Sequence, residues 1–422
     1  MARVVDRVVV VGQGYVGLPV AVRAAEVGFD VVGFDVDTRK VKLLNAGQSY
    51  VEDITEERLA SVIAAGAYRA SDQPGDVADF DVAVISVPTP MGEGVPDLSY
   101  IESACALVGP HITPGCTVIL ESTTYPGTTE ELALPILEAE SGLQAGGDFH
   151  LGYSPERIDP GNATWSLENT PTVVSGLGDA ALDAVDAFFG RLVERTVRVS
   201  GTREAELTKL LENTFRHVNI ALVNELAMFA NDLGIDVWEA IDAASTKPFG
   251  YMRFTPGPGV GGHCLPIDPS YLSWQVQRSL GQRFRFVELA NDVNEHMPDY
   301  VVRRVQDLLN RQARSVNGST ILLYGLAYKA NTGDARETPT RPLVEQLLGL
   351  GATVRLVDPH VPPHQFPEGA EAAEGSSSDL EAADVVVYLV DHDEFDTEMV
   401  SKSQAPVLDC RRALDGPQVH WL

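Results

Sequence analysis

The chain has 422 residues, of which 44% are hydrophobic, so it is long enough for two or three domains with separate cores. Sixty acidic residues against 31 basic ones give a formal net charge of −29, which disfavours general binding to nucleic acid or to an anionic membrane. The four cysteines lack the spacing of a disulfide framework or a zinc site, and no run approaches the ~18 apolar residues of a membrane span. We therefore expect a cytoplasmic protein.

The N-terminal segment predicts a strand, a tight turn and a helix. The apolar run RVVVV at residues 7–11 is typical of a strand buried on both faces of a parallel sheet. It leads into the pattern Gly12-x-Gly14-x-x-Gly17, and the next strand ends at an acid, Asp35. In this setting the pattern predicts a dinucleotide site, with a turn at Gly12, close approach of a pyrophosphate at Gly14 and helix–strand packing at Gly17. A turn that binds no cofactor is the alternative.

Asp35 indicates which dinucleotide is bound. Its carboxylate can accept hydrogen bonds from the adenosine ribose, and it repels a 2′-phosphate, which favours NAD over NADP. The neighbouring cations Arg39 and Lys40 leave NADP open.

Strand-like runs then alternate with helical stretches, which predicts a doubly wound parallel sheet. A second unit of the same layout, without the glycine pattern, begins near residue 319 and has an acid, Asp358, after its second strand. The predicted strands lie at 81–90, 117–127 and 170–176 in the first unit and at 319–329, 351–360 and 384–390 in the second, with a helix at 339–350.

Between the two units, residues 203–233 carry apolar residues at helical spacing without glycine or proline. Thr202 is a plausible N-cap, with Glu204 and Glu206 in the first turn, where the helix dipole favours acids. The predicted fold class is α/β, with two Rossmann-like doubly wound domains joined by a long central helix and a helical middle domain. We expect an NAD-binding domain at 1–200, a middle or dimerisation domain at 201–310 and a C-terminal nucleotide-sugar domain at 311–422.

The long helix carries Lys209 and Asn213, four residues apart and therefore on one face. Such a pair can position a hydroxyl group and a water, although a solvated helix face is the simpler interpretation.

Residues 256–268, PGPGVGGHCLPID, contain the most unusual cysteine. Glycines allow backbone N–H groups to approach a ligand, which would suit a nucleophile at Cys264 with an acid, Asp268, close by. Free cysteines are also commonly buried as small hydrophobic residues, so a structural thiol stays open. His263 beside the cysteine receives no role.

Polar loops supply further candidates. Thr123 lies in ESTTYPGTT, and Glu156 lies in YSPERIDPGN, each after an apolar run. Lys329 and Arg336 lie in YKANTGDARET at the mouth of the C-terminal unit, where two cations suit a diphosphate. Turn formation and surface ion pairs are the alternatives.

These segments together resemble the UDP-glucose/GDP-mannose 6-dehydrogenase family across nearly the whole chain. The matching blocks, in the family's order, are GQGYVG, ESTTYPGTT, SPERIDPGN, AELTKLLENTF, PGPGVGGHCLPIDP and GLAYKANTGDARET. The resemblance implies a four-electron oxidation of the C6 alcohol of a nucleotide sugar to a carboxylate with two NAD, through a thiohemiacetal and a thioester on Cys264.

The resemblance also implies roles for the other residues. Lys209, helped by Asn213, stabilises the oxyanion, Asp268 orients or activates the hydrolytic water, and Thr123 and Glu156 form an acid–base relay. The implied cofactor contacts are Gly12, Gly14, Tyr15, Val16, Gly17, Asp35, Arg39, Thr89, Thr123 and Arg336. The implied substrate contacts are Glu156, Arg157, Lys209, Asn213, Tyr251, Gly261, Lys329 and, on a looser match, Arg412. The family is commonly dimeric or higher through its middle helices.

Two loop sequences indicate which sugar the substrate carries. The blocks SPERIDPGN and GGHCLPID, with His263 and Ile267, resemble the UDP-N-acetylhexosamine branch, while UDP-glucose and dTDP-glucose stay open. A two-electron β-hydroxyacid dehydrogenase shares the Rossmann domain and the Lys/Asn pair but has no use for Cys264 or a C-terminal α/β domain. A non-catalytic nucleotide-binding protein would be expected to lack the catalytic residues, whereas Lys209, Asn213, Cys264 and Asp268 are all present.

Overall fold

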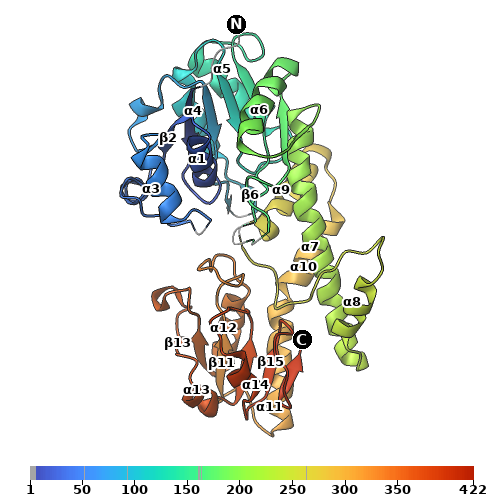
Figure 1. Cartoon of the computed structure of the whole chain (residues 1–422). Helices are drawn as coiled ribbons and strands as arrows, with labels where there is room; N and C mark the ends of the chain where they lie inside the picture. The colour runs from blue at the N-terminus through green and yellow to red at the C-terminus, as the bar shows by residue number, and fades with distance from the viewer. Residues whose placement is uncertain (1–5, 52, 93, 160–161, 163, 263) are drawn as a thin grey trace. The chain divides into compact units, whose positions relative to one another are not determined.

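The computed structural model describes residues 6–51, 53–92, 94–159, 162, 164–262 and 264–422, apart from the side chains of Cys264 and Pro266 (Figure 1). The chain forms two compact units, Met1–Glu212 and Asn213–Leu422. The division falls inside one helix, α7 (Thr202–Leu233). The predicted domain boundaries near residues 200 and 310 therefore remain a prediction.

The first unit is built on a sheet whose described strands run in the order β10-β9-β8-β7-β4-β1-β2-β3. Every pairing is parallel except that of β8 with β9. The order reverses between β1 and β4, and the carboxyl ends of these two strands flank the crevice in which such sheets bind ligands. The strands are β1 (Arg7–Val11), β2 (Asp30–Phe34), β3 (Tyr68–Ser71), β4 (Val82–Ile85), β7 (Thr117–Leu120), β8 (His150–Tyr153), β9 (Thr172–Gly176) and β10 (Thr196–Arg198).

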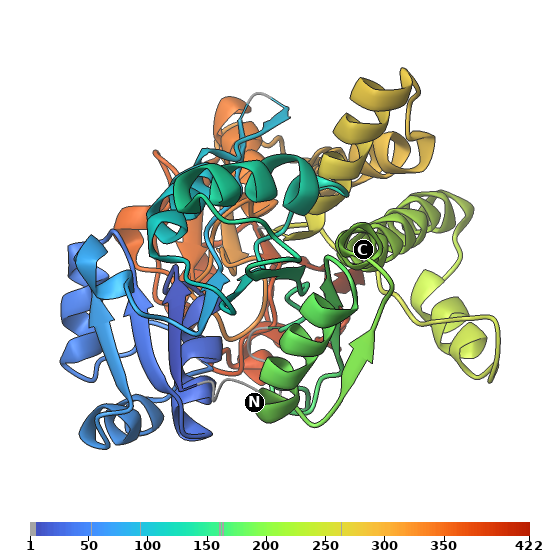
Figure 2. The ribbon, with the colours of Figure 1, turned by 90° about the horizontal axis from the view of Figure 1, so that it is seen from above.

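Helices cover both faces of this sheet, because its strands are apolar on both faces. Val8 and Val10 of β1 lie in one core with α1, α2, α3 and α6, whereas Val9 and Val11 lie in a second core with α4 and α5. Figure 2 shows α4 and α5 (teal) on one side of the sheet and α6 (green) on the other. The helices are α1 (Gly17–Glu26), α2 (Thr38–Asn45), α3 (Glu56–Ala64), α4 (Ser99–Val108), α5 (Leu134–Ser141) and α6 (Asp179–Leu192), with a short hairpin of β5 (Met91–Gly92) and β6 (Val95–Pro96).

The second unit holds a parallel sheet in the order β13-β12-β11-β14-β15-β16, preceded by helices. One core joins α11 and α12 to one face of this sheet, and another joins α13 and α14 to the opposite face. The strands are β11 (Thr320–Tyr324), β12 (Thr353–Val357), β13 (Glu371–Ala372), β14 (Val385–Tyr388), β15 (Val407–Asp409) and β16 (Val419–Trp421). The helices are α8 (Val237–Ser245), α9 (Cys264–Leu280), α10 (Arg285–Glu295), α11 (Met297–Arg311), α12 (Thr340–Gly349), α13 (Ser377–Ala382) and α14 (Thr397–Ser401).

The predicted fold class is confirmed, and one local prediction is wrong. Each unit has a mainly parallel, helix-covered sheet, and the long helix forms as predicted. Thr202, however, is the first helical residue, and its hydroxyl donates to Glu130 Oε1 at 3.0 Å instead of capping the helix. No helix in the described ranges is both long and apolar enough to cross a membrane.

Candidate active site

The glycine pattern lies at the turn from β1 into α1, and its three glycines serve different ends. Gly12 has φ +94°, and a Cβ there would lie 2.1 Å from the Ser86 carbonyl oxygen. A Cβ on Gly17 would lie 1.9 Å from the Gly12 carbonyl oxygen. A Cβ on Gly14, in contrast, would meet no atom within 4 Å. Gly12 and Gly17 are therefore required by the fold, while Gly14 leaves open space at the helix N-terminus, which suits a pyrophosphate.

This difference makes Gly14→Ala a test of the cofactor site that leaves the fold intact. We expect the variant to unfold at the wild-type temperature but to bind NAD at least about tenfold more weakly, because its methyl group occupies the space of the pyrophosphate. Calorimetric titration with NAD measures this effect. The matched control is Gly190→Ala in α6, which also adds a methyl group to open space. Unchanged NAD affinity in Gly14→Ala would contradict the placement of the pyrophosphate.

Asp35 follows β2 and is 7% exposed. Its Oδ2 accepts the backbone N–H of Gln13 at 3.0 Å, its Oδ1 accepts that of Asp37 at 2.9 Å, and Lys40 Nζ lies 3.5 Å away. Arg39 pairs with Asp37 at 3.0 Å. Both cations that left NADP open are thus paired with acids, and the Asp35 carboxylate keeps lone pairs that could accept hydrogen bonds from a ribose. The residues present fit NAD.

The loops after β4 and β7 are fastened together beside this crevice. Ser122 Oγ accepts the backbone N–H of Val87 at 2.9 Å and donates to the Val87 carbonyl oxygen at 2.8 Å. The two loops carry predicted cofactor residues, of which Thr89 is 3% exposed and Thr123 is partly exposed.

Lys209 lies buried on α7 and is paired with Glu156, which follows β8. Lys209 Nζ donates both to Glu156 Oε2 and to the Glu156 carbonyl oxygen, each at 2.7 Å. The other carboxylate oxygen of Glu156 accepts the backbone N–H of Ile158. The two charged side chains are only 6% and 8% exposed, so each depends on its partner. The pairing brings together two predicted site residues that are 53 positions apart.

Two acids of the first unit were not among the predicted site residues. Glu121 follows β7 and is 4% exposed, and its Oε2 has no hydrogen-bond partner in the described part of the chain. Glu206 is fully buried, and its carboxylate accepts the backbone N–H groups of Gly127 (2.6 Å) and Thr129 (2.9 Å). Glu206 therefore anchors the loop that carries Thr123, beyond the predicted interaction with the helix dipole. An acid directly after a buried strand, or on the buried face of a helix, is the signal that could have found them.

Asn213 and Asp268 meet in the second unit. Asn213 Nδ2 donates to Asp268 Oδ2 at 2.6 Å, and the two residues are 9% and 1% exposed. Asp268 lies in the first turns of α9, which begins at Cys264. His263 and the Cys264 side chain lie outside the described residues. The predicted amide of Asn213 and the predicted acid Asp268 are thus in contact. Asp268 lies one helical turn after Cys264, the predicted nucleophile.

The glycines before Cys264 pack against the segment 328–339. A Cβ on Gly261 would lie 2.7 Å from Tyr328 Cβ, and one on Gly259 would lie 2.8 Å from Pro339 Cβ. Gly262, at φ +83°, donates its N–H to the Arg336 carbonyl oxygen at 3.3 Å. Close packing between two loops therefore accounts for these glycines. From the sequence alone, they are instead expected to allow a ligand to approach the backbone.

Three predicted arginine contacts are paired with neighbouring acids. Arg412 Nη1 lies 3.2 Å from Asp236 Oδ2, and its guanidinium stacks 3.4 Å above the Trp421 ring. The other placements are Arg336 paired with Asp334 at 2.6 Å, Arg157 paired with Glu212, Lys329 partly exposed and Tyr251 38% exposed.

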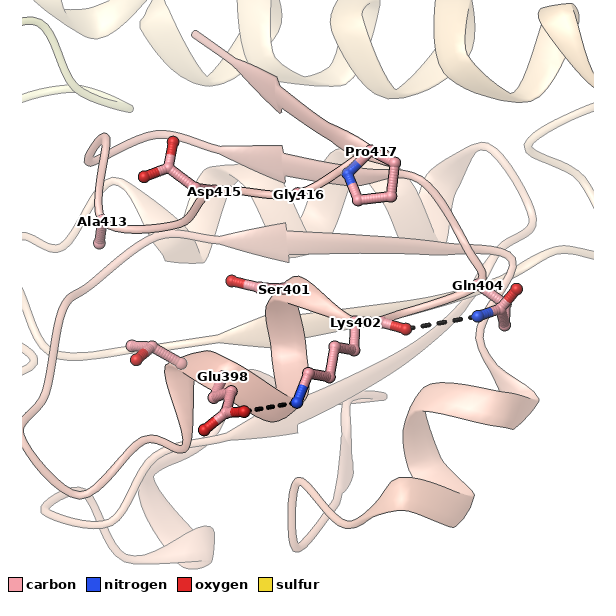
Figure 3. Close-up of a pocket in the computed structure, with 9 residues that line it drawn as sticks. Glu398, Ser401, Lys402, Gln404, Ala413, Asp415, Gly416 and Pro417 are labelled. Atoms are coloured by element: carbon pink, nitrogen blue, oxygen red, sulfur yellow. Dashed lines mark hydrogen bonds and ion pairs between the residues drawn. The ribbon is translucent and has the colours of Figure 1, made fainter.

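A pocket of about 520 Å³ lies between α14 and the segment 413–417. Figure 3 shows the side chains that line it. Its lining includes Lys402, which pairs with Glu398 at 2.5 Å on the same helix end. None of the predicted site residues lines this pocket, so it carries no part of the site described above.

The second unit repeats the geometry of the first at its strand ends. Gly325 N–H donates to the Val357 carbonyl oxygen at 2.8 Å, as Gly12 N–H does to that of Phe34 at 2.8 Å. Asp358 accepts the backbone N–H groups of Leu326 and Ala327, as Asp35 accepts that of Gln13. A dinucleotide-binding unit followed by a second unit of the same layout defines the class, a nucleotide-binding α/β protein of the kind that NAD-dependent dehydrogenases form.

Comparison with known proteins identifies the family. The UDP-glucose/GDP-mannose dehydrogenase family models match residues 6–191 (NAD binding domain), 203–296 (central domain) and 322–416 (UDP binding domain). The chain therefore belongs to the UDP-glucose/GDP-mannose dehydrogenase family.

Similar proteins match along nearly the whole chain. A UDP-N-acetyl-D-mannosamine dehydrogenase of Pyrococcus horikoshii is 35% identical over 422 residues, covering 99% of this chain and 98% of the relative. An NDP-N-acetyl-D-galactosaminuronic acid dehydrogenase of Ralstonia solanacearum is 35% identical over 400 residues, covering 92% and 90%. The solved structure of a UDP-D-ManNAc dehydrogenase from Pyrococcus horikoshii matches with a TM-score of 0.89 at 34% identity, covering 98% of both chains.

Proposed function

We propose that this chain oxidises the C6 alcohol of a UDP-N-acetylhexosamine to the uronate. The observation that carries the proposal is full-length similarity, at 35% identity, to dehydrogenases named for N-acetylated sugars. The loop text GGHCLPID points to the same branch.

The reaction removes four electrons from C6 in two oxidations, the first of which converts the alcohol to an aldehyde. NAD, which the turn at Gly12 to Gly17 and Asp35 would hold, would supply the hydride acceptor for each oxidation, with two molecules bound in turn. The C6 hydroxyl proton leaves through the Thr123–Glu156 relay. The Cys264 thiolate then attacks the aldehyde carbon, and the resulting thiohemiacetal becomes a thioester when the second hydride leaves. Water, oriented by Asp268, hydrolyses the thioester to the carboxylate and returns the thiol.

Lys209 serves this sequence as an electrostatic group. The negative oxygen on C6 at the tetrahedral stages needs a cation or hydrogen-bond donors in a site that excludes water. Lys209 is 5% exposed, and its Nζ is held 2.7 Å from the Glu156 carboxylate. The amide of Asn213, four residues further along α7, adds a second donor. A nucleophilic thiol works in a reducing compartment, and we infer a cytoplasmic location.

A screen of NAD reduction tests the sugar assignment. The purified chain is assayed with UDP-ManNAc, UDP-GlcNAc, UDP-GalNAc, UDP-glucose, dTDP-glucose and GDP-mannose. We expect kcat/KM for one UDP-N-acetylhexosamine to exceed that for UDP-glucose at least about tenfold, the value of one well-placed polar contact. A preference for UDP-glucose would overturn the assignment of the sugar while leaving the reaction type intact.

We further propose that two copies associate through the second-unit part of α7. Large apolar side chains recur along one side of this helix and are 46–72% exposed, namely Phe215, Leu222, Leu226, Phe229 and Leu233. Water-exposed apolar stripes of this kind are typical of subunit interfaces. Sedimentation analysis should give a dimer or a higher oligomer, and Leu226→Glu combined with Phe229→Glu should shift it toward monomer. A monomeric wild type would refute this interface.

A further inference from the structure

Glu121 is a buried acid that the proposed mechanism does not use. It directly follows β7 at the carboxyl end of the sheet, and its backbone N–H donates to the Ile85 carbonyl oxygen of β4 at 2.9 Å. The residue is 4% exposed, and its Oε2 finds no hydrogen-bond partner in the described part of the chain. Burying a carboxylate with an unpaired oxygen costs free energy, so such a group in a folded protein calls for an explanation.

Two charged groups of other elements act electrostatically on Glu121. Strand β7 pairs with β8, with Leu120 opposite Tyr153, which places Glu121 beside the segment that carries Glu156. The Glu156 carboxylate comes from the segment after β8, and the Lys209 ammonium comes from α7. No other charged side chain lies in its own segment, 117–124, or in the neighbouring segment 82–87, which contains β4. Burial, and to a lesser degree the charge of Glu156, raise the pKa of Glu121, Lys209 partly offsets the rise, and the pKa is about 8 as a result. At pH 7 the neutral acid therefore outnumbers the carboxylate about tenfold.

We propose that Glu121, in its neutral form, is a positioning residue of the active site. While Glu121 is neutral, Glu156 is the one carboxylate that competes with the substrate oxygen for the ammonium group of Lys209. This inference rests on the proposed function of Lys209. With Glu121 neutral, the Lys209–Glu156 pair has no net charge, and a negative oxygen on C6 is stabilised. Ionised Glu121 adds a second negative charge, which draws the ammonium away and opposes the oxyanion.

The sign of the pH effect follows. Glu121 is neutral below its folded pKa, so activity that depends on the neutral acid is present at pH 7 and is lost as the pH rises through about 8. Glutamine has nearly the same shape and cannot ionise. Glu121→Gln therefore fixes the neutral state at every pH.

The test compares kcat of the wild type and of Glu121→Gln between pH 7 and pH 9. Titrations that the two enzymes share, including that of a catalytic thiol, cancel in the ratio of their kcat values. We expect the wild-type to variant ratio to fall about tenfold across this range. Glu102→Gln, an exposed acid on α4, is the matched control, and its ratio should stay constant. A constant ratio for Glu121→Gln, as expected of a merely structural residue, would overturn the proposal.

A second measurement needs no turnover. Burial raises the pKa of Glu206 to about 7, so both enzymes carry a carbonyl band from that acid at pH 7. The infrared spectrum of the wild type minus that of Glu121→Gln should show a further carbonyl band of a protonated carboxylic acid at pH 7, and this band should bleach by pH 9. Absence of this further band would sink the proposal, as would the absence of any such band from the wild type if the variant failed to fold. If no nucleotide sugar reduced NAD but the band were present, the proposed function would fail while the neutral state of Glu121 stood.

Discussion

Replacing Cys264 by alanine is expected to lower the rate of uronate formation at least about 10³-fold, because the aldehyde carbon then has no nucleophile to hold it for the second oxidation. The first hydride transfer does not need the thiol, so the variant should still reduce NAD when hydroxylamine traps the aldehyde. Mass spectrometry of the nucleotide-sugar products, with and without the trap, separates the two stages.

Cys105→Ala is the matched control for this experiment. Cys105 is fully buried in α4, and burial raises the pKa of its thiol to about 12, so it is not a thiolate at neutral pH. Its removal should cost stability but leave uronate formation unchanged. Normal turnover by Cys264→Ala would rule out thioester catalysis in this chain.

Replacing Lys209 by methionine is expected to reduce kcat about 10²–10³-fold, the usual loss when one donor to an oxyanion is removed. The same change leaves the Glu156 carboxylate buried without its cation, which should also destabilise the fold by about 3–5 kcal/mol. Steady-state kinetics and urea denaturation measure the two effects on one preparation.

A double variant separates catalysis from folding. Lys209→Met with Glu156→Gln removes both charges, so much of the lost stability should return. Because Glu156→Gln alone also removes the relay, kcat of the double variant is compared with that of Glu156→Gln and should lie below it. Arg203, on the same helix as Lys209, makes exposed ion pairs with Glu130 and Glu131 of the segment 129–133. Arg203→Met should alter stability by less than about 1 kcal/mol and leave activity unchanged. A kcat of the double variant equal to that of Glu156→Gln would show that Lys209 has a structural role only.

The fold was predictable where the apolar pattern is long. The strands at 7–11 and 320–324 and the helix at 202–233 follow from continuous apolar runs or sustained helical periodicity. The short strands β3, β8 and β10 were missed. Each has three or four residues and includes glycine, histidine, arginine or serine, and neighbouring strands rather than local propensity decide such pairings.

The site was predictable as a set of residue types but not as a set of contacts. The sequence singled out Lys209, Glu156, Asn213 and Asp268, yet the pairing of the first two and of the last two depends on how separate elements fold back on each other. Glu121 was missed because its raised pKa comes from burial and from two charges that are distant in the sequence. Neither cause is visible in the residues next to Glu121.

The most direct test of the proposed reaction is the number of NADH molecules formed for each nucleotide sugar consumed. The account predicts two NADH per sugar, a uronate as the product and no free aldehyde in the wild type. One NADH per sugar, with an aldehyde or ketone as the final product, would contradict the four-electron mechanism.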